Sequence, residues 1–420
     1  MTPFADVHGL RRLGVWAGRS MVALVALGCL ARGSWAQDWS GYFKIFGIGF
    51  GVPQGVGIDD SLWQVSNRLR LKYQKSFPHD VGFNTAWEIS PRFQDTALFN
   101  FNPFGFPINS SSYRVAEFRP RIYPCDSCAG GYFGLYQNLD RVAVTWKARK
   151  ADVLLGRQAI AWGTARVISP TNVIAPFAFS DLDKEDVYGV DALRVRIPAG
   201  SLSEVDMGYL PGHNFDLREG ALFLRGRTNL KRTDVTLMLG SFRGDLLLGL
   251  DVARSLGQME FSLDAACVDV HFTDGAIRGP NYARVSVGLD RSLSSRLYGL
   301  IEYHFNSAGA GDPAGYSQLF TQPAYQNGNV YLLGRNYLSL GGNFQPTPLH
   351  TLRLLAVSNL TDGSISLSPS WEFNLTSNSY LEAGAVIGFG RAPSGGQPVR
   401  FRSEFGAYPD VLYAAYRYYF

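Results

Sequence analysis

The sequence contains no long apolar run and little net charge. Residues 37–420 hold no stretch of eighteen consecutive apolar residues. A membrane-spanning helix needs about twenty, so a helical membrane protein is not expected. Residues 1–36 contain four Arg and one Asp, so the rest of the chain has 35 basic and 34 acidic residues, a net charge of +1. This balance gives no support for nucleic acid as a partner.

Residues suited to catalysis or metal binding are also scarce. The five His after residue 36 stand apart in the sequence, and none belongs to an H-E-x-x-H or G-x-S-x-G motif. A hydrolase site around His271, with Ser or Asp neighbours, is the alternative, although any chain of this length offers such combinations by chance. We expect no enzymatic activity, no cofactor and no metal site.

Only four cysteines are present, and two of them, Cys125 and Cys128, form the run Y-P-C-D-S-C-A-G-G. A haem site would need His after the second cysteine, where Ala129 stands. A zinc site would need a second pair of ligands, which the isolated Cys267 does not supply. With a redox pair or metal site as the alternatives, we predict a disulfide between Cys125 and Cys128 that tightens a loop in an oxidising compartment.

The N-terminal segment predicts export. Arg11, Arg12 and Arg19 precede the apolar run M-V-A-L-V-A-L-G-C-L, and small residues follow it. This order is typical of a secretory signal peptide, and the apolar run is too short to span a bilayer. We predict that residues 1–36 are a cleaved signal peptide and that 37–420 form one domain. The alternative is a lipoprotein acylated at Cys29.

Alternation of apolar and polar residues is the dominant pattern after residue 36. The segment W-Q-V-S-N-R-L-R-L-K-Y-Q, residues 63–74, alternates throughout, with Asn67 as the interruption, and residues 81–90, 297–306 and 365–375 behave similarly. Period two is typical of a β-strand with one apolar and one polar face. A soluble antiparallel sheet shows the pattern too, but a transmembrane barrel requires it in every strand.

About eighteen such segments can be counted, with sixteen as the alternative because those near Val205, Val235 and Leu246 are the weakest. The segments begin near Trp39, Trp63, Val81, Leu139, Asp152, Val190, Val205, Ala221, Val235, Leu246, Met259, Tyr282, Leu297, Tyr337, Leu352, Ile365, Tyr380 and Leu412. Long connections are expected near 94–135, 163–188, 307–333 and 391–409. An even number places both termini on the periplasmic side. The sequence therefore predicts an all-β protein, an antiparallel transmembrane β-barrel.

The chain ends in V-L-Y-A-A-Y-R-Y-Y-F, which places Leu412, Ala414, Tyr416, Tyr418 and Phe420 on one face of a strand. A signal peptide, alternating strands and a final aromatic-x-Phe together resemble the outer-membrane β-barrels of Gram-negative bacteria. In that class the terminal rings are read by the barrel-assembly machinery. The resemblance implies this role for Tyr416, Tyr418 and Phe420, with the outer membrane as location and its lipid as partner.

A narrower resemblance, to porins of the alginate-export kind, rests on L-G-R-Q at 155–158, W-G at 162–163 and N-V-I-A-P at 172–176. Porins are commonly trimers, and the sequence leaves a monomer and a homotrimer both open. A TonB-dependent receptor would need a plug domain before the first strand, whereas a strand begins soon after residue 36.

The polar face of each strand is expected to line the lumen. The candidate pore-lining residues are Arg68, Arg70, Lys72, Glu88, Arg194, Arg196, Arg225 and Arg227. They favour a water-filled porin for passive diffusion of small hydrophilic solutes, with anions preferred. The alternative for any one residue is an Arg–Glu ladder that braces the wall. The alternative function is a surface adhesin or structural barrel plugged by its own loops.

The connection at residues 164–189 is too long for a hairpin and too apolar for a solvated loop. We predict that it folds into the barrel and faces Arg68, Arg70 and Lys72, so that a field crosses the narrowest point. The residues expected to pack against the wall are Val173, Ile174, Phe177 and Phe179. The carboxylates expected to face the wall are Asp181, Asp183, Glu185 and Asp186. The alternative is a loop lying over the outer rim.

Overall fold

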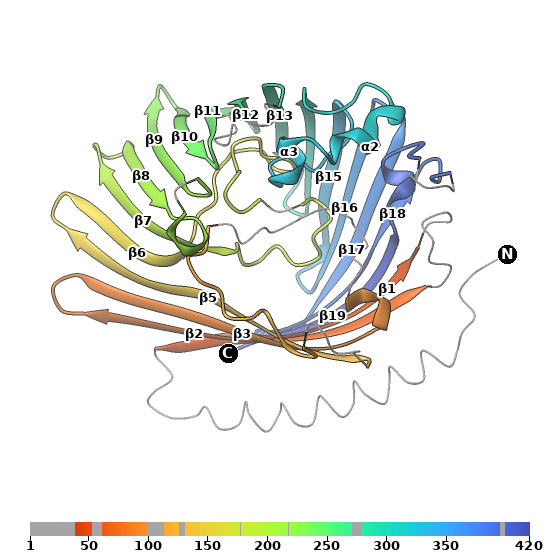
Figure 1. Cartoon of the computed structure of the whole chain (residues 1–420), viewed down its shortest axis with the longest axis horizontal. Coiled ribbons are helices and arrows are strands. Elements are labelled where there is room, and N and C mark those ends of the chain that lie inside the picture. The colour runs from red at the N-terminus through yellow and green to blue at the C-terminus, as the bar shows by residue number, and fades with distance from the viewer. Residues whose placement is uncertain are drawn as a thin grey trace.

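The computed structural model describes residues 38–52, 61–99, 113–125, 131–176, 178–216, 218–270, 279–394 and 400–420. The predicted signal peptide lies outside these residues. Of the strands in the single 19-stranded sheet, β4 (Arg121–Tyr123) pairs only with β5, and the others form a closed antiparallel barrel (Figure 1).

The wall of the barrel has eighteen strands, each paired with the next along the chain. They are β1 (Trp39–Gly51), β2 (Leu62–Phe77), β3 (Val81–Gln94), β5 (Phe133–Ala148), β6 (Ala151–Ala159), β7 (Gly189–Pro198), β8 (Glu204–Leu210), β9 (Ala221–Leu230), β10 (Thr233–Phe242), β11 (Asp245–Leu256), β12 (Met259–Asp269), β13 (Tyr282–Ser292), β14 (Leu297–Asn306), β15 (Asn336–Thr347), β16 (His350–Asn359), β17 (Ser364–Thr376), β18 (Ser379–Phe389) and β19 (Asp410–Tyr419). Pairing of β19 with β1 closes the ring.

The predicted fold class and the count of eighteen strands are confirmed. The weak segments near Val205, Val235 and Leu246 are the strands β8, β10 and β11, so the count of sixteen is wrong. β5 begins earlier than predicted, at Phe133, because its pairing with β3 continues as far as Phe93. The short strand β4 was not predicted.

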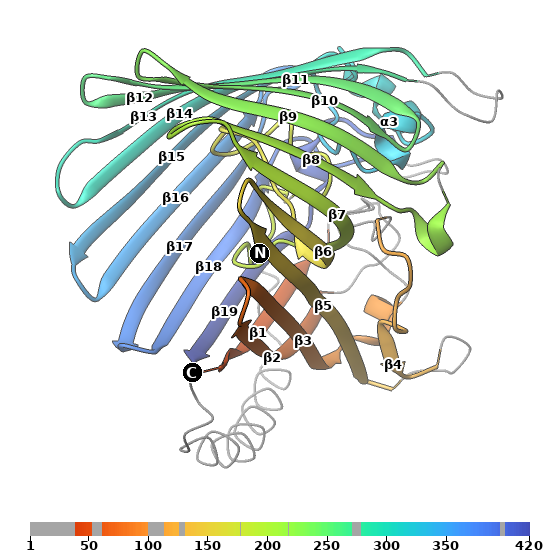
Figure 2. The ribbon, with the colours of Figure 1, turned by 90° about the vertical axis from the view of Figure 1, so that its left-hand side faces the viewer.

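The connections differ between the two ends of the barrel (Figure 2). One end carries short turns, such as Lys231-Arg232 between β9 and β10, where both residues have positive φ. The other end carries the long connections 160–188, 307–335 and 390–409, and the second of these contains the helices α2 (Tyr316–Leu319) and α3 (Pro323–Gln326). No helix in the described part of the chain is long and apolar enough to cross a membrane.

The outward face of the wall is apolar. On β9, β10 and β11, respectively, the buried residues Phe223, Met238 and Leu247 each stand between two exposed leucines. These leucines are Leu222, Leu224, Leu237, Leu239, Leu246 and Leu248. Soluble monomers rarely expose so large a contiguous apolar surface, whereas strands in lipid alternate in this way. The outward face therefore suits the acyl region of a bilayer.

The last residue closes the barrel through its backbone. The N–H of Phe420 donates to the Gly41 carbonyl at 3.0 Å, and the Gly41 N–H donates to the Phe420 carbonyl at 2.8 Å. A Cβ at Gly41 would lie 2.2 Å from the Arg70 carbonyl oxygen and 2.9 Å from the Phe420 ring, so only glycine fits between them. Leu412, Tyr418 and Phe420 are exposed on the outward side, as alternation requires. The role of the terminal rings in assembly stays a prediction.

Part of the lumen at the long-loop end is filled by protein. Ile160, Trp162, Tyr316, Tyr325 and Leu333 come from two connections and belong to one buried apolar cluster against the inner wall. Burial of these side chains stabilises the connections inside the ring, because each large apolar side chain removed from water contributes roughly 1.5–3 kcal/mol. The long connections are therefore packed elements of the fold.

Candidate functional site

Residues 160–188, here named the crossing loop, run through the lumen between opposite walls (Figure 1). The loop connects β6 to β7. Its first half is hydrogen-bonded to side chains of β11, β12, β13 and β14, and its second half to β1, β2 and β19. These two groups of strands lie on opposite sides of the ring. The crossing loop is therefore fixed at both ends of its span.

The acidic half of the crossing loop meets the wall at Lys44 of β1. The Lys44 ammonium donates to Asp183 at 2.9 Å and to Glu185 at 2.6 Å, and its side chain is completely buried. Asp183 also accepts from Arg68 at 2.8 Å, and Glu185 accepts from the Tyr419 hydroxyl at 2.7 Å. An unpaired buried ammonium is very costly. The loop carboxylates therefore neutralise Lys44 and make its burial in the wall possible.

Asp186 makes the second acidic contact. It accepts from the Tyr42 hydroxyl at 2.9 Å, and it pairs with Lys72 at 3.4 Å and Arg70 at 3.6 Å. Burial raises the pKa of Asp186, but the positive charges of Arg70 and Lys72 and the Tyr42 hydrogen bond outweigh burial and bring that pKa below its ordinary value. The carboxyl group is therefore ionised at neutral pH.

Asp181 departs from the prediction. Its carboxylate accepts a hydrogen bond from the Ala178 N–H at 2.9 Å, within the crossing loop, so its predicted place opposite the basic wall residues is wrong. Burial raises the pKa of Asp181 and lowers the pKa of Lys184, whose ammonium donates to the Phe179 carbonyl at 2.7 Å. Three of the four predicted acids meet the wall, and the fourth shapes the loop.

The other half of the crossing loop is held through its backbone. Glu302 of β14 accepts hydrogen bonds from the backbone N–H groups of Arg166 at 2.7 Å, Val167 at 3.1 Å and Ile168 at 2.9 Å. The glutamate is buried. Three successive N–H groups that point at one carboxylate form an anion-binding nest.

Residues 168–171 of the loop are bonded to the neighbouring strands as well. Asp264 of β12 accepts from the Ser169 hydroxyl at 2.5 Å and from the Thr171 N–H at 3.1 Å, and Asp251 of β11 accepts from the Thr171 hydroxyl at 3.1 Å. On β13, the Ser286 hydroxyl donates to the carbonyl of residue 168 at 2.6 Å. With Glu302 of β14 included, four adjacent strands thus form hydrogen bonds with this short stretch of the loop.

Most of the predicted pore-lining residues form ion pairs along the wall. The pairs are Arg68–Glu88 at 2.8 Å, Arg194–Asp206 at 2.6 Å, Arg196–Asp152 at 3.6 Å and Arg227–Asp234 at 2.9 Å. Arg70 pairs with buried Asp140, whereas Arg225 has no carboxylate within pairing distance among the described residues. Bracing of the wall, the alternative reading of these residues, therefore accounts for most of the set.

Sequence reasoning missed Tyr42, Lys44 and Tyr419 as contacts of the loop acids. Tyr42 and Lys44 are alternate residues on the inward face of β1, and the period-two pattern of that strand could have identified them. Two further predictions concern Phe177 and the pair Cys125 and Cys128. Phe177 and Cys128 lie outside the described residues, and Cys125 is disulfide-bonded. The pairing of Cys125 with Cys128 stays a prediction.

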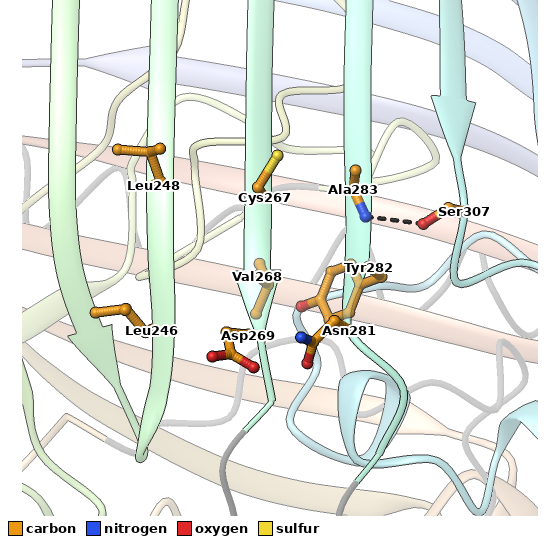
Figure 3. A pocket seen from close by; sticks show the side chains of 9 residues that line it. All are labelled: Leu246, Leu248, Cys267, Val268, Asp269, Asn281, Tyr282, Ala283 and Ser307. Carbon is orange, nitrogen blue, oxygen red and sulfur yellow. Dashed lines mark hydrogen bonds between the residues drawn. The ribbon is translucent and has the colours of Figure 1, made fainter.

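A groove of about 450 Å³ lies away from the crossing loop, at the outer ends of β11, β12 and β13 (Figure 3). Leu246, Leu248 and Cys267 line it from the exposed face of the wall, and its lining also includes the buried residues Val268 and Tyr282. Because its leucines belong to the apolar belt, the groove belongs to the lipid-facing surface.

No protein-family model and no curated protein sequence matches the chain. Solved structures do. The barrel is similar to OccAB3 of Acinetobacter baumannii (11% identity, TM-score 0.54, 91% of this chain and 98% of that one). It is also similar to OccD3 of Pseudomonas aeruginosa (8%, 0.53, 91% of each chain) and to OpdK of Pseudomonas aeruginosa (9%, 0.52, 91% and 99%). At these identities the likeness shows the fold alone, a closed antiparallel β-barrel.

Proposed function

We propose that the protein is a water-filled channel of the outer membrane through which small hydrophilic solutes diffuse. The observation that carries this proposal is the exposure of charged side chains inside the ring. Their exposed fractions are 26% for Arg68, 30% for Lys72, 35% for Glu185 and 39% for Arg353. Charged groups in contact with water line solute pathways and select the sign of the permeant ion. The crossing loop would be the constriction of this pathway.

A moderate preference for anions is part of the proposal. Most inward cations are neutralised by carboxylates, but Arg92 and Arg225 contact none within the described residues. The Arg92 guanidinium lies 4.2 Å from the centre of the Tyr136 ring. Guanidinium groups without a protein carboxylate can bind a passing carboxylate through two parallel hydrogen bonds. OpdK was crystallised with vanillate, an organic anion, which provides a first solute to test.

Planar-bilayer recording tests the channel and its selectivity separately. The purified, refolded protein should give unitary conductance steps. In a KCl gradient its reversal potential should have the same sign as the equilibrium potential of chloride. Vanillate should reduce the current at lower concentration than uncharged glucose does. Conductance without chloride preference would remove the anion proposal alone, whereas absence of steps from folded protein would remove the channel.

A barrel closed by its own loops is the second candidate function. The buried cluster around Trp162, Tyr316 and Tyr325 favours it, because these side chains fill part of the long-loop end. Such a barrel would serve as an adhesin or a structural protein. It would fold with full heat-modifiability and insert into bilayers without opening, which separates it from the channel.

The remaining partners follow from the channel proposal. The exposed leucine belt contacts outer-membrane lipid, and the terminal rings, including Phe420, are read by the assembly machinery during insertion. Chemical cross-linking in native membranes distinguishes a monomer from a homotrimer, since only the trimer yields a discrete three-subunit product.

A further inference from the structure

The stretch Arg166–Thr171 of the crossing loop is bonded at nearly every backbone position by the wall. Glu302 accepts from the N–H groups of Arg166, Val167 and Ile168, and Asp264 accepts from the N–H of Thr171. The two carbonyls at 168 and 170 accept from Ser286 at 2.6 Å and from Arg284 at 2.7 Å. This stretch is therefore bound much as a peptide ligand would be.

Glu302 accepts from three successive backbone N–H groups of the crossing loop, whereas Asp264 accepts from one loop N–H and Asp251 from a loop hydroxyl. Glu372, for comparison, pairs with Arg353 at 3.2 Å and Arg417 at 2.6 Å. Within the described residues no Lys or Arg forms an ion pair with Glu302, and its hydrogen-bond donors are backbone N–H groups of the loop. A buried carboxylate is costly without compensating donors. The loop backbone supplies those donors, so Glu302 and the loop each depend on the other.

The two attachments of the crossing loop differ in kind. The acidic attachment uses ion pairs whose carboxylates stay partly accessible to water, with 14% of the Asp183 and 35% of the Glu185 side chain exposed. Salt screens such pairs. The attachment at Glu302 is buried and made of hydrogen bonds to fixed backbone groups, which salt affects little. The position of the loop across the lumen therefore depends chiefly on the buried end.

We propose that Glu302 is the positioning residue of the constriction: its carboxylate binds the nest of Arg166, Val167 and Ile168 and so sets the width of the pathway. This inference rests on the proposed channel function. It assigns Glu302 no direct contact with solute. Substitution should therefore change pore width and loop mobility more than the sign of ion selectivity.

The experiment compares Glu302→Gln with Glu372→Gln, which removes the same charge from the lumen without contact to the crossing loop. In Glu302→Gln one carboxylate oxygen becomes an NH₂ group that faces N–H donors, so the nest loses one of its two acceptor oxygens and the negative charge. Single-channel conductance should rise about twofold or more, as the open cross-section grows, with added current noise. Glu372→Gln should stay within the wild-type conductance. Equal effects of the two variants on conductance would overturn the proposal.

A second variant approaches the contact from the loop. Val167→Pro removes one N–H donor and leaves every wall residue in place, so the barrel strands can fold even if Glu302→Gln fails to do so. It should also raise conductance, and wild-type conductance would overturn the proposal.

Amide hydrogen exchange at residues 166–168 adds a measurement that needs no open channel. Faster exchange in Glu302→Gln than in Glu372→Gln supports the proposal, and equal exchange refutes it even if the wild type conducts normally. A silent wild type would remove the channel function, and the exchange result would still decide whether Glu302 holds the loop.

Discussion

At the scale of single residues, the effect of a charged side chain on ion selectivity depends more on its ion-pair partner than on the sign of its own charge. Arg68 and Lys72 were expected to face carboxylates of the crossing loop, and Arg68 pairs with Asp183 and Lys72 with Asp186. An ion pair in a partly wet lumen presents little net field to a passing solute. We therefore expect ion selectivity to change when a substitution neutralises one member of an ion pair, because its partner then acts on the solute.

Asp183→Asn breaks such a pair and leaves Lys44 with Glu185 as its remaining partner. The reversal potential should shift toward anions, because the lumen loses one negative charge while Lys44 and Arg68 keep their positive charges. Loss of the charge-assisted hydrogen bonds should weaken the attachment of the loop by about 1.5–3 kcal/mol. Asp181→Asn is the matched control, since the Asp181 carboxylate accepts its hydrogen bond from Ala178 within the loop and not from a wall cation. An equal shift of the reversal potential in both variants would contradict the pairing seen here.

Glu404 predicts a pH dependence of stability. It is fully buried and accepts from the Leu333 N–H at 3.0 Å and from the Asn359 amide at 2.7 Å, which ties the connections 307–335 and 390–409 together. Burial raises the pKa of Glu404 from 4.5 to about 7. Because the pKa is raised in the folded state, the neutral form is favoured there, and this contribution to stability is full below about pH 4.5 and is lost as the pH rises through about 7.

Thermal unfolding in detergent should therefore occur at lower temperature at about pH 8 than at about pH 5. Glu404→Gln, which cannot ionise, should flatten this part of the profile, whereas Glu372→Gln should retain it. A profile of Glu404→Gln with the wild-type slope would show that another group titrates.

At the scale of elements, the sequence predicted what depends on near neighbours. The strands follow from alternation within about ten residues, as in β9 and β10, and their turns follow from short polar runs. The elements that escaped prediction are brief and depend on distant contacts. β4 has three residues and α2 has four, too few for a periodic signal. Glu302 lies 134 residues from Ile168, and no local pattern could join them.

The connection 307–335 offers a test of how far the long loops close the mouth. Asn336 pairs with Phe305 in the β14–β15 ladder, so the strand ends are adjacent and can be joined by a short Asn-Gly turn. Replacing residues 308–333 by that turn removes Tyr316, Tyr325 and Leu333 from the lumen. The barrel should still fold, and single-channel conductance should increase. Tyr325→Phe, which removes the hydroxyl that donates to the residue 332 carbonyl and keeps the ring, should conduct as the wild type does. Unchanged conductance after the replacement would place the pathway away from this connection.

At the scale of the whole molecule, the barrel is stable in lipid only as a closed ring. A sheet edge in the bilayer would leave a row of backbone groups without partners, each at a cost of several kcal/mol. The seam of the ring joins β1 to β19, which are the first and the last strand of the chain. Phe420 makes the final two backbone hydrogen bonds of that seam with Gly41. Phe420 thus contributes to the seam and is also a candidate assembly signal.

Deleting Phe420 should leave export unchanged and impair insertion, because translocation and closure of the ring use different parts of the chain. The deletion removes both hydrogen bonds to Gly41 and the exposed ring together, whereas Phe420→Ala removes the ring and keeps the backbone of the seam. Phe389→Ala removes another exposed ring, at the far end of β18, and serves as the control. Heat-modifiable electrophoretic mobility of outer-membrane fractions measures the folded barrel in each variant. If the ring is the assembly signal, Phe420→Ala should lower the folded fraction nearly as much as the deletion, while Phe389→Ala should not. If only the deletion lowers it, closure of the seam is what requires residue 420, and wild-type folding of the deletion variant would refute both roles.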